Sequence, residues 1–383
     1  MLIGIDARMY GLKHAGIGRY VENLVVNLLK IDEENDYTLF VRQEDVDSIK
    51  KQVLSIKHDK KLKFIVAEAR HYTLKEQLLL PYLISRERLD LIHFPHFNVP
   101  LFCPTKFVVT IHDLLWHEMK GSEVTTLSGV KYFLKYSGYK LVFAHSVQQA
   151  EKIFVPTKWV KEKILSTCQI SPDKIIVTYE GIGAIYLKDR SVSENTLLNK
   201  YHIKEPFLIY TGSAYPHKNL NLLFDAVKTI NNSTKVKVEL VIASARNVFR
   251  DRLSEKIKKD HLEGQVKILD FVPDEDLYEI YQRSLAFVFP SLSEGFGLPG
   301  LEAMASGAPV LAAANGALEE VYQDAALFFN PRKVDSLVEK VTLLQKNPRL
   351  KQELINKSKS LVKSYSFLQM AQQTLSGYQS IEE

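Results

Sequence analysis

The fold is decided by the stretch FVFPSLSEGFGLPGLEAMASGAPV, Phe287–Val310. In it an apolar strand runs into a glycine-rich turn, and Pro299 is placed to be the first residue of a helix because its ring fixes a helical φ. The N–H groups and the positive dipole end of that helix then point at whatever lies in front of the turn. This strand–turn–helix unit predicts a site for a phosphate or diphosphate.

Two carboxylates flank the turn. Glu294 follows the strand, and Glu302 is expected in the first turn of the helix, where negative charge suits the dipole. Carboxylates that faced the anion would repel it, so they make better sense as acceptors for hydroxyls on either side, such as ribose and hexose. The alternative without a ligand is that Glu302 is an ordinary carboxylate of the first helical turn and that the glycines only make a tight connection between strand and helix.

A second interpretation comes from Gly295–Gly300, which matches the dinucleotide fingerprint G-x-G-x-x-G, with Glu319 and Glu320 about twenty residues further on. That fingerprint normally lies in the first strand–helix–strand unit of its domain and is followed by several more strands. Only two candidate strands follow residue 300, so the pattern disfavours a dehydrogenase.

Outward from this stretch, short apolar runs alternate with segments of helical period, which is typical of parallel α/β domains. Strands are expected at 2–6, 37–41, 62–66, 91–94, 107–111 and 175–178, and again at 207–211, 238–243, 266–269, 285–289, 309–313 and 325–329. A polar stretch, 187–204, separates the two series. The pattern predicts α/β domains over 1–186 and 187–365 and a helix in 366–383, with the ligand site in the cleft between the domains.

The start of the second series carries another candidate. The strand ending at Gly212 leads through a short loop to Lys218, at the mouth of the next helix. A lysine there is disfavoured by the helix dipole, which points to a functional reason. As a point charge it would neutralise a phosphate leaving group.

The first half offers two weaker signals. Gly16 and Gly18 open a helix after the first strand and would allow a ligand to approach the backbone closely. His112 and Asp113 end an apolar strand, although spacing alone favours an ordinary capping or core pair for them.

Composition excludes several classes of protein. The chain has 383 residues, 46% of them hydrophobic, and a net charge of +5, so it is neither disordered nor a candidate for nucleic-acid binding. Two cysteines, Cys103 and Cys168, make neither a disulfide framework nor a zinc cluster. With no signal peptide or apolar span in view, we expect a cytoplasmic protein.

Taken together, these motifs resemble the retaining nucleotide-sugar glycosyltransferases of family 4. Glu294 and Glu302 match the E-x7-E motif of that family, and residues 212–220 resemble its phosphate-binding loop. Residues 15–20 resemble its donor-side glycine loop, and 111–113 its N-domain histidine. The resemblance implies the α/β GT-B fold: two Rossmann-like domains facing a central cleft, an acceptor-binding N-domain, a donor-binding C-domain, and a C-terminal helix that crosses back to the N-domain.

The resemblance also implies roles for individual residues. Glu302 would accept from the ribose, Glu294 would lie beside the transferred sugar, and His112 would lean on that sugar near its reacting carbon. Lys218 would bind the phosphates, Gly16 would pack against the β-phosphate, and the turn would offer N–H groups. The implied catalytic set is His112, Lys218 and Glu294, and the donor-binding set is Gly16, Gly18, Ser213, Lys218, Glu294, Gly295, Phe296, Gly297, Leu298 and Glu302.

The chain departs from the family at Ser213, where arginine is common. The pair of cations on the phosphates would then be reduced to Lys218, helped by His217 or Arg246. Retention implies attack from the face that the diphosphate leaves, without a mandatory side-chain base; in an inverting enzyme Asp113 or His112 would be the candidate base.

No metal or cofactor is expected. Asp45–Asp47 and Asp274–Asp276 match the bare D-x-D pattern of metal-dependent transferases, but neither closely follows a strand, and Asp274 is better explained as a helix N-cap. The expected donor is GDP-mannose, with a UDP-hexose as the alternative.

The acceptor is expected to be a glycan or a lipid-linked saccharide. A basic stretch, Lys50–Lys63, precedes an amphipathic run, Tyr72–Leu83, and the two would suit an anionic membrane surface or simply a solvated face beside a core helix. Two alternatives to transfer remain: a GT-B-fold epimerase or hydrolase of nucleotide sugars, and a nucleotide-sugar-binding protein without turnover.

Overall fold

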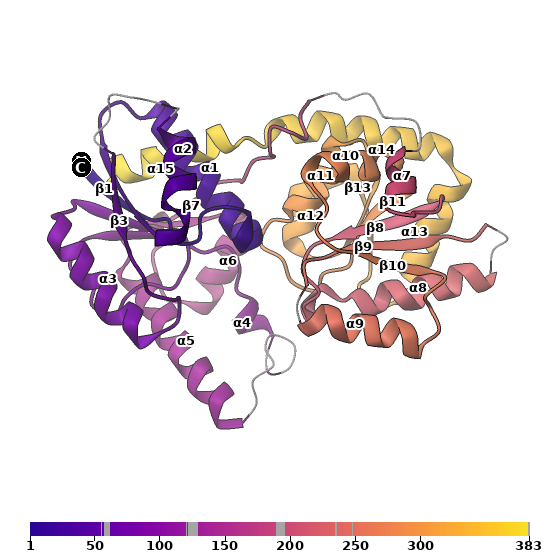
Figure 1. The fold of residues 1–383 in the computed structure, drawn as a ribbon, viewed down its shortest axis with the longest axis horizontal. Helices are drawn as coiled ribbons and strands as arrows, with labels where there is room; N and C mark the ends of the chain where they lie inside the picture. Colours follow the sequence, from indigo (N-terminus) through magenta and orange to yellow (C-terminus); the bar gives the residue numbers. More distant parts are fainter. Residues whose placement is uncertain are drawn as a thin grey trace. The chain divides into compact units, whose positions relative to one another are not determined.

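The computed structural model describes residues 1–54, 56, 62–119, 121, 129–188, 196–233, 236–246 and 248–381. The chain forms two compact units. Unit 1 comprises Met1–Leu114, Ser128–Gly181 and Ser366–Glu383, and unit 2 comprises Leu115–Leu127 and Ile182–Tyr365. Both are α/β (Figure 1).

Unit 1 is built on a parallel sheet which, within the described residues, has seven strands in the order β3-β2-β1-β4-β5-β6-β7. Most of its strands are buried apolar runs, as sheets covered on both faces require, whereas the edge strand β3 is only partly buried. They are β1 (Leu2–Asp6), β2 (Asp36–Val41), β3 (Leu62–Val66), β4 (Leu91–Phe94), β5 (Phe107–Thr110), β6 (Ile153–Val155) and β7 (Ile175–Val177).

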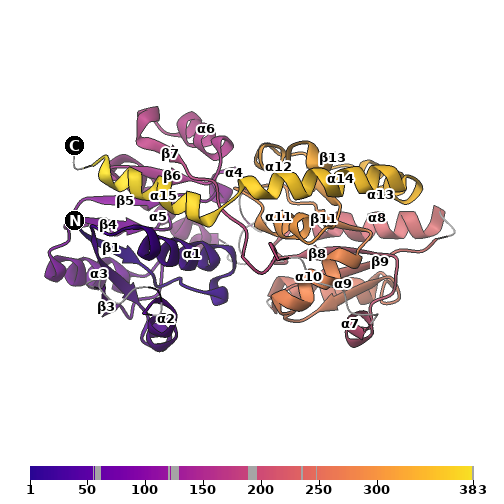
Figure 2. The same ribbon diagram turned by 90° about the horizontal axis from the view of Figure 1, so that it is seen from above.

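The helices of unit 1 lie on both faces of this sheet. They are α1 (Ala15–Ile31), α2 (Val46–Val53), α3 (Leu74–Glu87), α5 (Gly129–Gln149), α6 (Lys158–Thr167) and α15 (Phe367–Gln379). The last of these is the C-terminal helix, and it packs along α1 (Figures 1 and 2). The Tyr378 hydroxyl fixes it by a 2.6 Å hydrogen bond to Nδ1 of the buried His93 on β4.

Unit 2 has a second parallel sheet, of six strands in the part of the chain described, in the order β10-β9-β8-β11-β12-β13. Its strands are β8 (Phe207–Thr211), β9 (Glu239–Ala243), β10 (Val266–Leu269), β11 (Ala286–Phe289), β12 (Val310–Ala313) and β13 (Ala326–Phe329). Its helices are α4 (Leu115–Glu118), α7 (Thr196–Lys200), α8 (Leu220–Ser233), α9 (Val248–Lys259), α10 (Asp274–Arg283), α11 (Leu298–Ala305), α12 (Gly316–Tyr322), α13 (Val334–Lys346) and α14 (Pro348–Leu361).

The two α/β domains and the returning C-terminal helix agree with the fold class predicted from the sequence. One strand, β6, was not predicted. Among the residues described, no helix has the length and apolarity that a membrane span demands.

In each unit the chain reverses its direction across the sheet at one point. In unit 1 the reversal lies between β1 and β4, and in unit 2 between β8 and β11. The loops that leave the carboxyl ends of such neighbouring strands diverge to opposite faces, and ligands of open α/β sheets bind at that position. The candidate site of unit 2 therefore lies beyond β8 and β11.

Candidate active site

Two predicted site residues, Lys218 and Glu294, lie in contact beyond β8 and β11, where the chain of unit 2 reverses its direction across the sheet. Lys218 ends a short 3-10 turn, Pro216–Lys218, after β8, and Glu294 lies in the loop after β11. Lys218 Nζ donates to Glu294 Oε1 at 2.5 Å and lies 5.6 Å from the centre of the Phe289 ring. Both side chains are mostly buried, so the pair is weakly screened by solvent.

The glycine-rich turn leads into α11 earlier than predicted. The helix begins at Leu298, so Pro299 is its second residue rather than its first. Gly297 is the N-cap in a left-handed conformation, φ +96°, which explains why glycine stands there. The side chains of Phe296 and Leu298 are buried. The backbone at the start of α11 is therefore what the turn presents.

Tyr322 gives these glycines a structural role as well. Its hydroxyl donates to the Gly297 carbonyl at 2.5 Å, and a Cβ on Gly300 would lie 2.2 Å from the same hydroxyl. The Tyr322 side chain thus packs against the turn and leaves no room for a Cβ at Gly300. The alternative that the glycines serve to make a tight connection between strand and helix is therefore partly right.

Glu302 does not lie where it was expected. Because α11 begins at Leu298, Glu302 belongs to the second turn of the helix, and it is buried, with 5% of its surface exposed. The favourable interaction with the helix dipole falls off after the first turn, so the dipole does not account for this carboxylate.

The phosphate-binding loop has no second cation at Ser213 or His217, and a helping role of Arg246 stays a prediction. Ser213 is half-buried, and its carbonyl accepts from the Tyr210 hydroxyl at 2.7 Å. Burial, together with the charge of Lys218, lowers the pKa of His217 to about 3. His217 is therefore neutral near pH 7, and the expectation that it assists Lys218 as a cation is wrong.

Two asparagines that were not predicted organise these loops. Asn219, in a left-handed conformation, donates its side-chain amide to the carbonyl oxygens of Pro290 and Pro331 at 3.3 and 2.8 Å. Asn315 caps α12 and donates to the Ser291 carbonyl at 3.0 Å. The only sequence signal for Asn219 was its place directly after Lys218, because asparagine tolerates the left-handed region.

In unit 1 the predicted glycines have different surroundings. A Cβ on Gly18 would lie 1.9 Å from the Gly11 carbonyl oxygen, so close backbone packing explains that glycine. Gly16 is exposed in the first turn of α1, and nothing lies within 4 Å of the place where a Cβ would stand. Of the two, Gly16 alone has open space for a ligand.

His112 is held at both of its ring nitrogens. Nδ1 lies 3.3 Å from the Glu180 carboxylate, and Nε2 lies 3.0 Å from the Pro95 carbonyl. Burial lowers the pKa of His112, but Glu180 and Pro95 outweigh it, and the net effect is a raised pKa. Two acceptors favour the doubly protonated ring. The Tyr20 ring, 4.6 Å away edge-on, comes from the helix that Gly16 opens.

The carboxylates of the D-x-D sequences have local partners. Asp45 accepts from Lys13 at 3.0 Å. Asp276 accepts from Lys200 and from the Tyr201 hydroxyl, both at 2.6 Å. Asp274 is the first residue of α10 and Pro273 its N-cap, so the expected capping role of Asp274 is wrong.

Comparisons with protein families cover both units. Residues 14–184 match the family model described as Glycosyltransferase Family 4, and residues 195–361 match the model described as Glycosyl transferases group 1.

Individual relatives agree with this match. The chain is 26% identical to O-antigen chain mannosyltransferase B of Escherichia coli over 372 residues, which covers 95% of each protein. It is 25% identical to the O-antigen chain mannosyltransferase RfbU of Salmonella typhimurium, with 79% of the chain and 76% of the relative covered. The fold is similar to that of Anabaena Alr3699/HepE, solved with UDP and glucose, at a TM-score of 0.74, 15% identity and 99% coverage of both chains.

Proposed function

The chain belongs to family 4 of the glycosyltransferases and has the GT-B fold. We propose that it transfers a hexose, with mannose favoured, from a nucleotide diphosphate sugar to a hydroxyl of a glycan or lipid-linked saccharide. We further propose that the transfer retains the configuration at the anomeric carbon. The observation that carries this proposal is the Lys218–Glu294 pair beside the N-terminal end of α11.

The favoured donor is GDP-mannose. Two relatives that align with most of the chain are named as mannosyltransferases of O-antigen chains. The solved structure with UDP and glucose keeps a UDP-hexose as the alternative donor. By analogy with the named relatives, the product is part of a cell-surface polysaccharide.

The chemistry of the site fits departure of a diphosphate. Cleavage of the bond between the anomeric carbon and the diphosphate places negative charge on the leaving group and positive charge on the sugar ring. Lys218 and the start of α11 are fixed before the reaction and stabilise that negative charge, an effect worth about 3 kcal/mol per donor group in known enzymes. A bound diphosphate would accept from Lys218 in place of Glu294, which then turns to the hydroxyls of the sugar.

Retention is favoured over inversion by the surroundings of His112. A general base needs a free nitrogen lone pair, and both ring nitrogens of His112 face acceptors. We therefore assign His112 a place beside the transferred sugar, where a protonated ring would interact with the departing oxygen. Asp113, exposed next to it, is the candidate base of an inverting reaction. A mechanism without a metal remains part of the proposal.

The decisive experiment is incubation of the protein with a panel of nucleotide sugars, with and without acceptor extracts. A transferase releases nucleotide much faster when the extract holds its acceptor, and the sugar appears in a larger product. Nucleotide release that ignores the extract would indicate a hydrolase, and an altered sugar still bound to its nucleotide an epimerase. Binding without any turnover would indicate a nucleotide-sugar-binding protein.

We also propose that unit 1 docks on anionic membrane. Its helices α3 and α5 connect strands that run in the same direction across the sheet, so right-handed crossovers place both helices on one face. The loop between β4 and β5 joins them: the Leu101 N–H donates to Gln77 of α3 at 2.9 Å, and the Phe97 ring contacts Tyr139 of α5.

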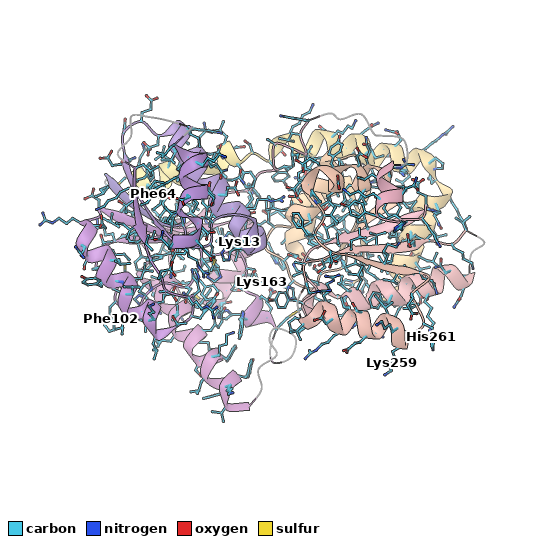
Figure 3. The ribbon with its side chains drawn as sticks, viewed as in Figure 1. Lys13, Phe64, Phe102, Lys163, Lys259 and His261 are labelled. Carbon is cyan, nitrogen blue, oxygen red and sulfur yellow. The ribbon has the colours of Figure 1, made fainter. Side chains whose placement is uncertain are left out.

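Large apolar side chains are exposed on these three segments. They form what we call the apolar surface: Leu74, Leu78 and Tyr82 of α3, Phe102 of the loop (labelled in Figure 3), and Val130, Phe133, Leu134 and Leu141 of α5. Leu74 and Phe102 are more than 80% exposed. Such a patch on one face marks an interaction site.

The charges around the apolar surface favour anionic lipid as the partner. Helix α5 contains no Asp or Glu, and its lysines, Lys131, Lys135 and Lys140, are exposed between the apolar residues. Apolar side chains interspersed with cations are typical of surfaces that bind anionic lipid. Of the basic stretch predicted from the sequence, Lys57, Lys60 and Lys61 lie outside the described residues.

Flotation with vesicles tests this docking. We expect the protein to float with phosphatidylglycerol-containing vesicles, and the double variant Phe102→Ser/Phe133→Ser to lose this association. Phe271→Ser is the matched control, because Phe271 is a 74% exposed phenylalanine of unit 2. Wild-type protein that stays at the bottom of the gradient would contradict the docking without touching the transfer reaction.

A further inference from the structure

A buried charged network lies at the carboxyl edge of the sheet in unit 1, where no role had been expected. Arg8, fully buried just after β1, donates to both Asp6 oxygens at 2.7 and 2.6 Å and to Glu76 Oε1 at 2.7 Å. It also donates to the Ala69 carbonyl at 2.9 Å. A buried guanidinium with two carboxylates is costly to desolvate, so it is weak support for stability alone.

The network holds the loop between β3 and α3. The second Glu76 oxygen accepts from the Tyr72 N–H at 2.8 Å and from the Asn98 side chain at 2.7 Å. Tyr72 has a φ of +64°, in the left-handed region that a bulky residue rarely adopts. Strained residues of this kind persist where the surrounding structure fixes them, and they concentrate at functional sites.

The strained backbone displays an aromatic ring. Tyr72 is 54% exposed, which is unusual for a residue held so firmly through its backbone. Its hydroxyl lies 3.3 Å from His96 Nε2, and its ring contacts the rings of His96 and Phe97. Burial raises the pKa of the Tyr72 phenol, and the negative charge of Asp113, exposed after β5, raises this pKa further. The loops after β3, β4 and β5 thus contribute to one cluster.

The chemistry of this cluster suits a ligand with an uncharged polar ring, such as a sugar. Burial lowers the pKa of His71 to about 4 and of His96 to about 3, so both histidines are neutral near pH 7 and can donate as well as accept hydrogen bonds. The charge of Arg8 is engaged by Asp6 and Glu76. The face of an aromatic ring attracts groups of positive partial charge, such as the C–H groups on one face of a pyranose.

We propose that Tyr72, His96 and Asp113 form a saccharide subsite of unit 1, in which a sugar of the acceptor stacks on the Tyr72 ring and its hydroxyls bind His96 and Asp113. The Arg8 network positions the ring and does not touch the sugar. This inference rests on the proposed function, because the transfer reaction requires a saccharide acceptor. The subsite borders the start of α3, where the apolar surface begins, so a lipid-linked saccharide would reach both.

The test must distinguish loss of the Tyr72 ring from destabilisation of the fold. Tyr72→Gly removes the ring but adopts a φ of +64° without strain, so its melting temperature should equal or exceed that of the wild type. Tyr72→Phe keeps the ring and is the matched control. Saturation-transfer NMR with methyl α-mannoside, methyl α-glucoside and methyl α-galactoside measures binding of the probe sugars.

We expect at least one probe to bind the wild type and Tyr72→Phe with affinities within about threefold of each other, and to bind Tyr72→Gly about tenfold more weakly, as loss of one stacked ring predicts. Asp113→Asn should weaken binding of the same probe sugar. Unchanged binding to Tyr72→Gly, or no binding of any probe to the wild type, would overturn the subsite.

Nucleotide release from the donor into water, measured on Tyr72→Gly and Tyr72→Phe, should be unchanged, because Tyr72 lies in unit 1, whereas Lys218, Glu294 and the start of α11 lie in unit 2. If the wild type turns over no nucleotide sugar at all, the proposed function fails; if turnover persists while Tyr72→Gly binds sugar normally, only the subsite fails.

Discussion

At the scale of the residue, Lys218 carries the largest expected effect. Lys218→Ala should lower kcat by about 10²-fold or more, because the charge that stabilises the leaving diphosphate is lost and Glu294 is left without its cation. The matched control is Lys228→Ala, which removes an exposed lysine from α8 of the same unit. Steady-state rates of nucleotide release measure both; a Lys218→Ala rate within threefold of the wild type would reject this site.

The ionisation of His112 gives a pH prediction. Its pKa lies above the usual value near 6.5 because the Glu180 carboxylate and Pro95 outweigh burial. The protonated ring therefore stabilises the fold fully below pH 6.5, and this contribution is lost as the pH rises through the raised pKa.

Glu180→Gln removes the carboxylate charge, so the pKa of His112 should fall. Histidine-selective NMR titration of the wild type and the variant measures the shift directly, with His112→Gln identifying the resonance. A pKa that stays the same or rises in Glu180→Gln would contradict the role assigned to the pair.

Single residues also mark the limit of what the sequence could tell. Lys218 and Glu294 were both singled out, yet their contact joins positions 76 residues apart and depends on the adjacency of β8 and β11. The neutrality of His217 follows from burial, which a single sequence does not display. Tyr72 was named only as the start of an amphipathic run, because its significance lies in its φ and in its contact with His96 from another loop.

At the scale of the element, the first turn of α1 separates two roles for glycine. Gly18→Ala should lower the free energy of unfolding by about 1–3 kcal/mol, because the new Cβ would overlap the Gly11 carbonyl. Gly16→Ala meets nothing within 4 Å, so stability should stay the same or rise by up to about 1 kcal/mol.

The same pair tests the donor role of Gly16. If its open space admits the β-phosphate, Gly16→Ala should raise the donor KM several-fold in a stably folded protein. Chemical denaturation and donor titration distinguish the two effects. Normal donor affinity in Gly16→Ala would leave Gly16 without a functional reason.

Elements were predictable where their patterns are long. Buried parallel strands are continuous apolar runs, and most were found. Runs of three residues are at the limit of this pattern: β7 was found and β6 was missed. The start of α11 was placed too late, because proline is acceptable at both the first and the second position of a helix. That error of register also moved Glu302 into the wrong turn.

At the scale of the whole molecule, the proposed mechanism uses this chain's own cation and helix terminus to stabilise the leaving group. Turnover of the donor should therefore survive an excess of EDTA, and added Mg²⁺ or Mn²⁺ should change the rate by less than about twofold. Loss of activity with EDTA that a divalent metal restores would show that a metal supports the diphosphate instead.

The alternation of strands and helices along the chain was enough to predict the two α/β domains. Of the apolar surface, the sequence indicated only the α3 part, as the amphipathic run Tyr72–Leu83, and it left membrane docking open, since the same spacing describes a helix packed beside a core and a helix that exposes its apolar side chains. Only the exposed fractions of these side chains in the folded protein distinguish the two.

The most direct measurement is a crystal structure of the protein with the donor that the nucleotide-sugar panel identifies. The account predicts the diphosphate within hydrogen-bond distance of Lys218 Nζ and of backbone N–H groups at the start of α11, with the ribose hydroxyls on Glu302. A nucleotide bound in unit 2 away from Lys218 and α11, or bound in unit 1, would contradict it.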